Sequence, residues 1–292
     1  MRKSTRRKAG RNELLQPFLK WAGGKRQLLP YLRDYFPEFS SRATYFEPFL
    51  GAGAVLFDLQ PHKAHVNDAN TELINCYEVI KCNPEALIED IRRHENTSEY
   101  YYQLRELDRS PDYEKLSPVQ RASRIIFLNK TCYNGLFRVN SQGHFNVPYG
   151  NYKNPTIIDE IVIRAISSYL NKYDITLTNL DFAEAVKTAK RGDVVYFDPP
   201  YDPISDTSSF TGYNLDKFGR DEQRRLKSVF DELTARGCKV LLSNSSTEFI
   251  EALYVDYQVF RIRASRNINS VATGRGQIDE FLILNYDPDI KK

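Results

Sequence analysis

The sequence predicts an α/β protein with a doubly wound sheet, into which a helical and hairpin module is inserted. Before and after residues 94–155, short runs of β-branched and aromatic residues alternate with segments of helical periodicity. Within residues 94–155, tyrosines, arginines and a turn-rich run replace that alternation. The 292 residues, 41% of them hydrophobic, suffice for one large domain with such an insertion.

The first expected elements precede residue 94. A loop from Pro17 leads into a helix near Lys25. The run TYFEPFLGAGAVLFDL is typical of a strand, a tight glycine turn and a helix. The run KAHVNDAN predicts a second short strand, and residues 71–93 have apolar residues at helical spacing.

The inserted segment predicts a helix over residues 118–130 and a hairpin whose turn lies at residues 141–143. The strand–helix alternation then resumes. It predicts helices over 157–171, 182–190 and 221–236, and strands over 175–180, 194–197, 239–243, 257–263 and 279–285. We therefore expect residues 15–70 and 156–286 to form one α/β domain and residues 71–155 to form the inserted module.

Composition and cysteine spacing argue against several classes of protein. No apolar run approaches the roughly 20 residues of a membrane helix, and the N-terminus lacks the apolar core of a secretory signal. The cysteines form no Cys-x-x-Cys pair and have no matching histidine cluster, which indicates reduced thiols in the cytoplasm and no zinc site. These cysteines are Cys76, Cys82, Cys132 and Cys238.

Two basic segments have two interpretations each. The run MRKSTRRKAGR offers little to bury, so we expect a disordered basic tail over residues 1–14. It is either an arm that follows DNA phosphates or a solubilising leader. Residues 261–277 are basic and contain glycine, and they form either a loop that clamps phosphates or a disordered connector.

Acidic residues stand at the ends of three expected strands: Glu47, Asp68 and Asp198. Open α/β sheets bind ligands at the carboxyl ends of their strands. Gly51 and Gly53 provide a tight turn where a backbone can approach a ligand, although the third glycine of a dinucleotide fingerprint is missing. Asp68 suits the hydroxyl groups of a ribose, and its alternative role is that of a helix N-cap.

The run DVVYFDPPYDP ends a buried strand with a carboxylate, two prolines and a tyrosine. Pro199 and Pro200 cannot donate backbone hydrogen bonds, so the sheet ladder stops there. Each proline also favours an extended conformation in the residue before it. We therefore expect Asp198 and Pro199 to present their oxygens at the end of the strand, with Tyr201 beside them.

Five segments of the chain, taken in order, resemble the Dam-type DNA adenine-N6 methyltransferases of class alpha. They are FLKWAGGKRQLL, YFEPFLGAGAVLF, HVNDANTELIN, NGLFRVNSQGHFNVPYG and VVYFDPPY. The resemblance extends from Pro17 to Tyr286. It implies a seven-stranded Rossmann-like domain that uses S-adenosylmethionine without a metal, and an inserted target-recognition domain. It further implies a monomer or weak dimer that acts on GATC in duplex DNA, in some members beside a cognate restriction endonuclease.

For such an enzyme the Asp-Pro-Pro-Tyr run has a chemical explanation. The lone pair of adenine N6 is delocalised into the ring, which makes the nitrogen a poor nucleophile. The Asp198 carboxylate and the Pro199 carbonyl can accept both amino hydrogens, and Tyr201 offers a face for stacking. Pro200 completes the motif, and the adenine must be flipped out of the duplex to reach it.

The resemblance also implies which residues bind the cofactor and the DNA. Lys25 would meet the methionine carboxylate, and Trp21 would line the cofactor site. The other implied cofactor residues are Glu47, Phe49, Gly51, Gly53, Asp68, Asp181, Phe182 and Asp198. The implied DNA-binding residues are Lys20, Asn134, Arg138, Val139, Asn140 and Pro148, and Arg138 is expected to contact guanine O6 and N7.

Three alternative functions stay open. The chain could methylate cytosine N4 or RNA adenine, although such relatives more often have Ser or Asn where this chain has Asp198. It could instead be a catalytically silent DNA-binding regulator. A nuclease is disfavoured, because no carboxylate–lysine arrangement for Mg²⁺ is recognisable. We expect a cytoplasmic, DNA-associated protein of bacterial or phage type.

Overall fold

The computed structural model describes residues 11–21, 25–203, 218–265 and 277–288. Most of the expected basic tail (residues 1–10) and much of the basic segment 261–277 (residues 266–276) lie outside the described residues. Arg11 and Asn12, also expected in the tail, contact the end of a helix. The Arg11 guanidinium lies 2.7 Å from an Asp58 carboxylate oxygen, and the Asn12 amide donates to Gln60 at 3.0 Å.

The described residues form one seven-stranded sheet with the order β3-β2-β1-β4-β5-β7-β6. The strand order reverses between β1 and β4, and β7 runs antiparallel to β5 and β6 while the other neighbours are parallel. The strands are β1 (Tyr45–Glu47), β2 (Lys63–Asn67), β3 (Asp174–Thr178), β4 (Val194–Phe197), β5 (Lys239–Ser245), β6 (Gln258–Ser265) and β7 (Gln277–Leu284). This sheet confirms the predicted fold class.

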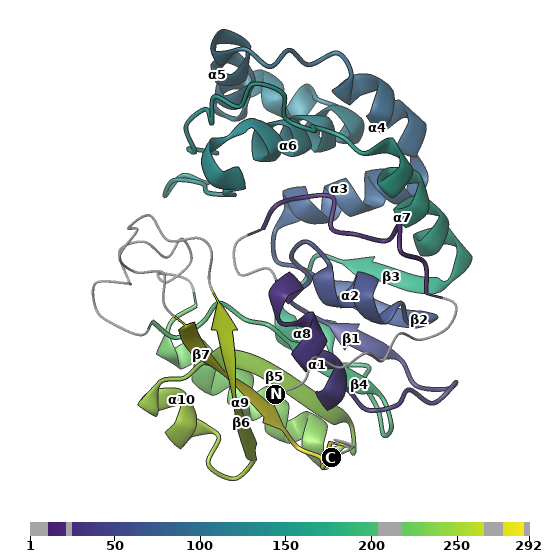
Figure 1. Cartoon of the computed structure of the whole chain (residues 1–292), viewed down its shortest axis with the longest axis vertical. Coiled ribbons are helices and arrows are strands. Elements are labelled where there is room, and N and C mark those ends of the chain that lie inside the picture. Colours follow the sequence, from purple (N-terminus) through teal and green to yellow (C-terminus); the bar gives the residue numbers. More distant parts are fainter. Residues whose placement is uncertain (1–10, 22–24, 204–217, 266–276, 289–292) are drawn as a thin grey trace.

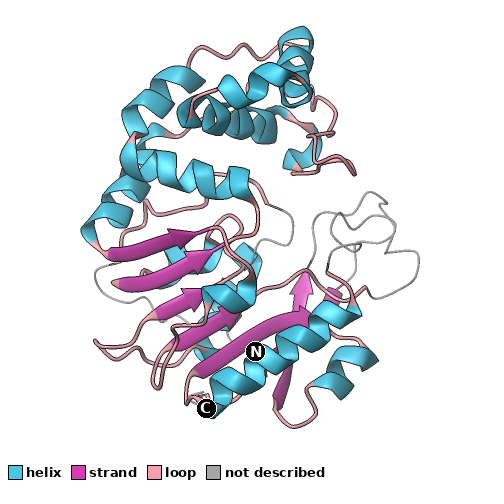
Figure 2. Cartoon of the chain, turned by 180° about the vertical axis from the view of Figure 1, so that it is seen from behind, coloured by secondary structure: helices cyan, strands magenta, loops and turns pink. Residues whose placement is uncertain are grey.

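Strand β4 shows why the sheet lies at the centre of the molecule. All four of its residues are buried, because successive side chains point to opposite faces and helices cover both faces. Val194 and Tyr196 belong to one hydrophobic cluster, whereas Val195 and Phe197 belong to the other. Helices lie on both sides of the strands in Figures 1 and 2.

The first hydrophobic cluster packs against α1, α2, α3 and α7, and the second packs against α8, α9 and α10. The bounds of these helices are α1 (Leu29–Tyr35), α2 (Ala54–Leu59), α3 (Thr71–Cys82), α7 (Glu160–Lys172), α8 (Phe182–Ala185), α9 (Arg220–Ala235) and α10 (Glu248–Leu253). A short 3-10 turn, η1 (Lys25–Gln27), precedes α1.

The inserted module contains α4 (Pro84–Ile91), α5 (Ser98–Glu106) and α6 (Pro118–Thr131), which lie at the top of Figure 1. Further short turns are η2 (Leu107–Arg109), η3 (Pro111–Lys115) and η4 (Tyr133–Gly135). The expected hairpin is present after η4: the Asn146 amide donates to the Arg138 carbonyl at 2.9 Å. A small hydrophobic core, with Tyr101, Phe127 and Phe145 at its centre, joins this hairpin to the helices.

Some expected boundaries were wrong. The single helix expected over residues 71–93 is two helices, because Pro84 lacks the amide hydrogen that would continue α3. Helix α8 ends at Ala185 rather than near residue 190. Helices α5 and α10 were not predicted at all. Within the described ranges, no helix has the length and apolar character needed to cross a membrane.

Candidate active site

The ends of three neighbouring strands bring acidic residues to one edge of the sheet. Glu47 is the last residue of β1, and Asp68 and Asp198 directly follow β2 and β4. Asp198 is followed by the two prolines, whose carbonyls differ in their contacts. Gln223 donates to the Pro200 carbonyl at 2.8 Å. Among the described residues, no hydrogen bond reaches the Pro199 carbonyl, which leaves it available as an acceptor.

The Asp198 carboxylate forms an ion pair inside the site. Lys25 Nζ lies 2.7 Å from Asp198 Oδ1, and the side chains are 5% and 19% exposed respectively. Burial raises the pKa of Asp198 to about 6, although the nearby Lys25 ammonium lowers it. The carboxylate is therefore ionised near neutral pH and partly accessible.

Tyr201 connects this ion pair to a residue that the sequence did not single out. Its hydroxyl donates to Glu280 Oε2 at 2.8 Å, and Lys25 Nζ lies 4.6 Å from its ring centroid. Glu280 is on β7 and only 4% exposed. The site thus contains two carboxylates, one ammonium and one phenol from three separate segments of the chain.

A buried polar network holds the chain that follows Tyr201. Asn244, in β5, accepts a hydrogen bond from the Asp202 amide at 3.2 Å and donates to Gln223 at 3.0 Å. Ser245 donates to the Asp202 carbonyl at 2.6 Å. The polar run SNSS at the end of an otherwise apolar strand was the available sequence signal for this network.

The conformation and close contacts of the glycine turn after β1 disfavour any other residue there. Gly53 has a φ of +72°, and a Cβ atom there would lie 2.7 Å from the Tyr77 hydroxyl oxygen. Gly51 has a φ of +52°, and its Cβ would lie 3.1 Å from Trp21 Cδ1. The side chains of Tyr77 and of Trp21, the only tryptophan of the sequence, therefore lie close to the backbone of this turn.

Asp68 fixes this turn. Its two carboxylate oxygens accept hydrogen bonds from the amides of Gly51 and Asn70, both at 2.9 Å. The N-cap of α3 is Asn70, so the alternative role of Asp68 as that helix cap is wrong. Glu47 is buried and accepts a hydrogen bond from the Tyr45 hydroxyl at 2.9 Å. Burial raises the pKa of both Glu47 and Asp68.

Phe49 and Phe182, both expected at the cofactor site, lie in contact. Their ring centroids are 5.4 Å apart, and the ring planes are inclined by 30°. Arg225, from α9, places its guanidinium carbon 4.1 Å from the Phe182 centroid. The same guanidinium binds both oxygens of Asp181, at 2.9 and 2.6 Å, and this hydrogen bonding lowers the pKa of Asp181. Sequence reasoning missed Arg225, because it lies in a run of charged residues typical of any exposed helix face.

The inserted module is bonded directly to the segment that contains Trp21. Asn129, fully buried in α6, accepts from the Lys20 amide at 2.9 Å and donates to the Lys20 carbonyl at 2.8 Å. It also donates to the Gly135 carbonyl at 3.1 Å. The Trp21 ring stacks on Phe137 with centroids 4.9 Å apart. Asn129 was missed, and its only signal was an amide within an apolar helical run.

The residues expected to contact DNA lie on or beside the hairpin. The Arg138 guanidinium donates to the side chain and the carbonyl of Asn146, at 2.7 and 3.0 Å. Asn140 accepts from the amides of Gln142 and His144, which stabilises the hairpin turn. Val139 pairs with Phe145 across the hairpin.

The other three expected DNA contacts surround the turn η4. Asn134 is left-handed, with a φ of 55°, and the Pro148 carbonyl accepts from the Tyr133 amide at 2.9 Å. Lys20 Nζ lies 5.0 Å from the centroid of the Tyr152 ring. Tyr133 is an aromatic residue that sequence reasoning did not select, and it is 52% exposed on this surface.

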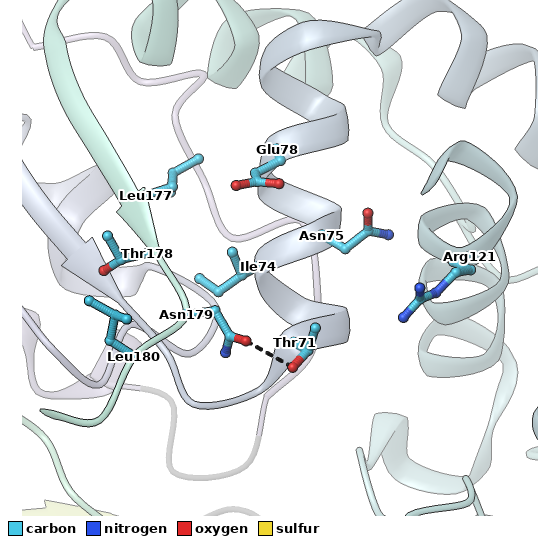
Figure 3. Close-up of a pocket in the computed structure, with 9 residues that line it drawn as sticks. All are labelled: Thr71, Ile74, Asn75, Glu78, Arg121, Leu177, Thr178, Asn179 and Leu180. Atoms are coloured by element: carbon cyan, nitrogen blue, oxygen red, sulfur yellow. Dashed lines mark hydrogen bonds between the residues drawn. The ribbon is translucent and has the colours of Figure 1, made fainter. Parts of the chain in front are cut away.

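A hollow of about 330 Å³ opens between α3, α6 and the end of β3. In Figure 3, the Asn179 side chain reaches Thr71 across one side of this hollow, with a hydrogen bond of 2.9 Å. Asn179 also donates to the Asp68 carbonyl at 2.8 Å. The hollow therefore adjoins the Asp68 turn, and none of its lining residues was expected at the site. In the described part of the chain, no three His, Cys, Asp or Glu residues gather to bind a metal.

Comparison with known proteins gives a consistent result. Residues 21–268 match the model of the D12 class N6 adenine-specific DNA methyltransferase family. The type II methyltransferase M1.LlaDCHI of Lactococcus lactis subsp. cremoris is 49% identical over 93% of this chain and 96% of its own. The type II methyltransferase M.MjaIII of Methanocaldococcus jannaschii is 40% identical, over 93% of this chain and 99% of its own. The DNA adenine methylase of Escherichia coli K12 is 33% identical, over 94% and 96%.

Proposed function

This chain belongs to the D12 class N6 adenine-specific DNA methyltransferase family, and we propose that it methylates GATC sites with S-adenosylmethionine as donor. It is an adenine-specific DNA methyltransferase. The proposal adds the identity of the donor, the sequence methylated and the role of each residue at the site. The observation that carries it is the convergence of Asp198, the Pro199 carbonyl and Tyr201 at the end of β4.

The residues at the edge of the sheet fit the proposed donor. Glu47, Asp68 and Asp198 supply carboxylates on three neighbouring strand ends, which suit a ligand with a sulfonium cation and ribose hydroxyls. Gly51 and Gly53 have no side chains that would cover the turn, so a ligand can approach the backbone itself. Phe49 and Phe182 offer aromatic surface for an adenine ring. When bound, the donor would supply a methyl group that its sulfonium already activates.

The residues after β4 would act on the target base. Asp198 and the Pro199 carbonyl accept the two hydrogens of the N6 amino group, which localises the nitrogen lone pair toward the methyl group. Tyr201 stacks on the base, a contact that contributes about 1–3 kcal/mol. A base within the duplex cannot reach these groups, so the adenine is flipped out.

GATC recognition is proposed from the hairpin. Residues 134–150 resemble the recognition segment of GATC-type members, and a guanidinium can bind guanine O6 and N7 at once. Asn146 holds Arg138 through two hydrogen bonds, so its planar group is already oriented. Lys20 lies nearby over Tyr152 and is assigned to the first guanine.

The names of two relatives bear on the cellular role. M1.LlaDCHI and M.MjaIII are named type II methyltransferases, so we also propose a cognate restriction endonuclease that acts on the same site. We further propose a cytoplasmic, DNA-associated protein of bacterial or phage type.

Sequencing of modified bases tests the proposal most broadly. DNA from cells that express the chain should contain N6-methyladenine at GATC and no N4-methylcytosine. Purified protein should transfer labelled methyl groups from S-adenosylmethionine to duplex DNA but not to RNA. Methylation at another sequence would overturn the GATC assignment alone. Absence of any transfer would instead support the silent DNA-binding alternative.

A further inference from the structure

We propose that Glu280 is a positioning residue that holds the Tyr201 ring in the orientation needed to stack on the target adenine. The inference rests on the proposed function, because it assigns a further residue to the same site. Glu280 lies 79 residues beyond Tyr201 in the sequence, and the Tyr201 hydroxyl donates to its Oε2 at 2.8 Å.

The backbone of Glu280 is held on both sides by the sheet. In the antiparallel ladders, Glu280 pairs with Ser245 of β5 and with Ile262 of β6. Tyr201, by contrast, lies outside any strand or helix, directly after two prolines. The hydrogen bond from Tyr201 to Glu280 therefore ties the tyrosine ring to a residue whose own position is fixed by the sheet.

Burial strengthens this hydrogen bond. Glu280 is only 4% exposed, so water competes little for its carboxyl oxygen, and a hydrogen bond is stronger in a protein interior than in water. The hydrogen bond fixes the position of the hydroxyl oxygen, and therefore the direction of the long axis of the ring. Because a phenol O–H prefers to lie in the plane of its ring, the fixed acceptor also limits rotation of the ring about that axis.

Orientation of this ring matters because base stacking needs a parallel face at a defined position. Loss of the hydrogen bond would leave the aromatic ring in place but let it tilt. We therefore expect weaker retention of the flipped base and slower methyl transfer, without a change in donor affinity. This pattern separates a positioning role from a merely structural one.

The experiment compares four variants in steady-state methyl transfer to a GATC duplex: Glu280→Ala, Glu280→Gln, Tyr201→Phe and the double variant Tyr201→Phe/Glu280→Ala. Extrusion of the base is followed with 2-aminopurine at the target position, and donor affinity by calorimetry. Glu280→Ala and Tyr201→Phe should each lower kcat/KM for DNA by about ten- to a hundredfold. Glu280→Gln should stay close to the parent, because its amide oxygen still accepts the phenol proton.

The double variant should be no worse than the poorer single variant, since both changes remove the same hydrogen bond. Asp58→Ala is the matched control, because it removes another buried carboxylate, one bonded to Arg33 of α1. It should lower stability and leave kcat/KM of the folded protein unchanged. If Glu280→Ala does not fold, reduced activity of Tyr201→Phe beside an active Glu280→Gln supports the inference.

Parental kcat/KM and base extrusion in folded Glu280→Ala, or in Tyr201→Phe, would overturn the inference. Losses that multiply in the double variant would overturn it as well. These outcomes leave the proposed function intact, since the parent remains active in the same assay. A parent that transfers no methyl group to adenine would overturn both.

Discussion

Lys25 and Asp198 form an ion pair at the centre of the site, with Nζ 2.7 Å from Oδ1. The ammonium also lies above the Tyr201 ring. We assign the Asp198 carboxylate to the amino group of the target base, and the Tyr201 ring to stacking on that base. Lys25 contacts both of these groups. One oxygen of the Asp198 carboxylate is thus paired with a cation, and Lys25 must shift to give that oxygen and the ring face to the base.

The first prediction concerns pH. Asp198 must be ionised to accept a hydrogen bond from N6, and its pKa is about 6. The plot of kcat/KM for DNA against pH should therefore fall as the pH drops through about 6, because this ratio reports the free enzyme. The charged and titratable groups nearby are Lys25, Glu280, Tyr201 and Glu47.

Replacing Lys25 tests the sign of this effect. The ammonium lowers the pKa of Asp198, so Lys25→Met should raise that pKa and move the acidic limb to higher pH. The same variant should be less active at every pH if Lys25 also binds the donor. An acidic limb that stays in place in Lys25→Met would show that another group titrates.

The second prediction concerns base recognition. Arg138→Ala should lower discrimination at one guanine of the site by about 1–3 kcal/mol. The measurement is competition between a GATC duplex and duplexes with one changed base pair. Asn146→Ala should have a smaller effect in the same direction, because it removes one of two hydrogen bonds that orient the guanidinium. Equal weakening on all sequences would reassign Arg138 to the DNA backbone.

The third prediction concerns the connection between the inserted module and the site. Asn129→Ala would leave the amide and the carbonyl of Lys20 without their buried partner. We expect a loss of at least about 2 kcal/mol in the free energy of unfolding, measured with denaturant. Asn129→Asp is the matched variant, since it keeps the acceptor for the Lys20 amide and loses the donors. An unchanged free energy of unfolding in Asn129→Ala would contradict this role.

The fourth prediction concerns the glycine turn. It distinguishes the effect of backbone strain from the effect of a steric clash when a glycine is replaced by alanine. Gly53→Ala should be destabilised and should bind the donor more weakly, because its Cβ would lie 2.7 Å from the Tyr77 hydroxyl oxygen. Gly192 also has a positive φ, +88°, but no atom within 4 Å of its Cβ position. Gly192→Ala should therefore cost only the left-handed strain of about 1–2 kcal/mol and leave donor affinity unchanged. Equal effects of the two substitutions on donor affinity would contradict the assignment of the Gly51–Gly53 turn to the donor site.

Sequence patterns identified the central sheet well, for a physical reason. Strand β4 was predicted with its observed bounds, because a buried strand must be apolar throughout and the prolines end it. The break at Pro84 was missed, because helical spacing of apolar residues continues across it. Short helices such as α10 have too few residues for a clear period.

The site was only partly predictable. Strand-end acids were found because parallel strands bring their carboxyl ends to one edge. Glu280 escaped this reasoning, since β7 runs antiparallel and its amino end reaches the same edge. Arg225 and Asn129 act through contacts distant in sequence, to Asp181 and Lys20, which no local pattern reveals.

The most direct test of the central claim is methyl transfer by Asp198→Ala on a GATC duplex, with unfolding measured on the same sample. Our account predicts a cooperative unfolding transition at lower stability than in the parent, because Lys25 loses its ion-pair partner, and transfer reduced at least about a hundredfold. Turnover close to the parental rate in the folded variant would contradict it.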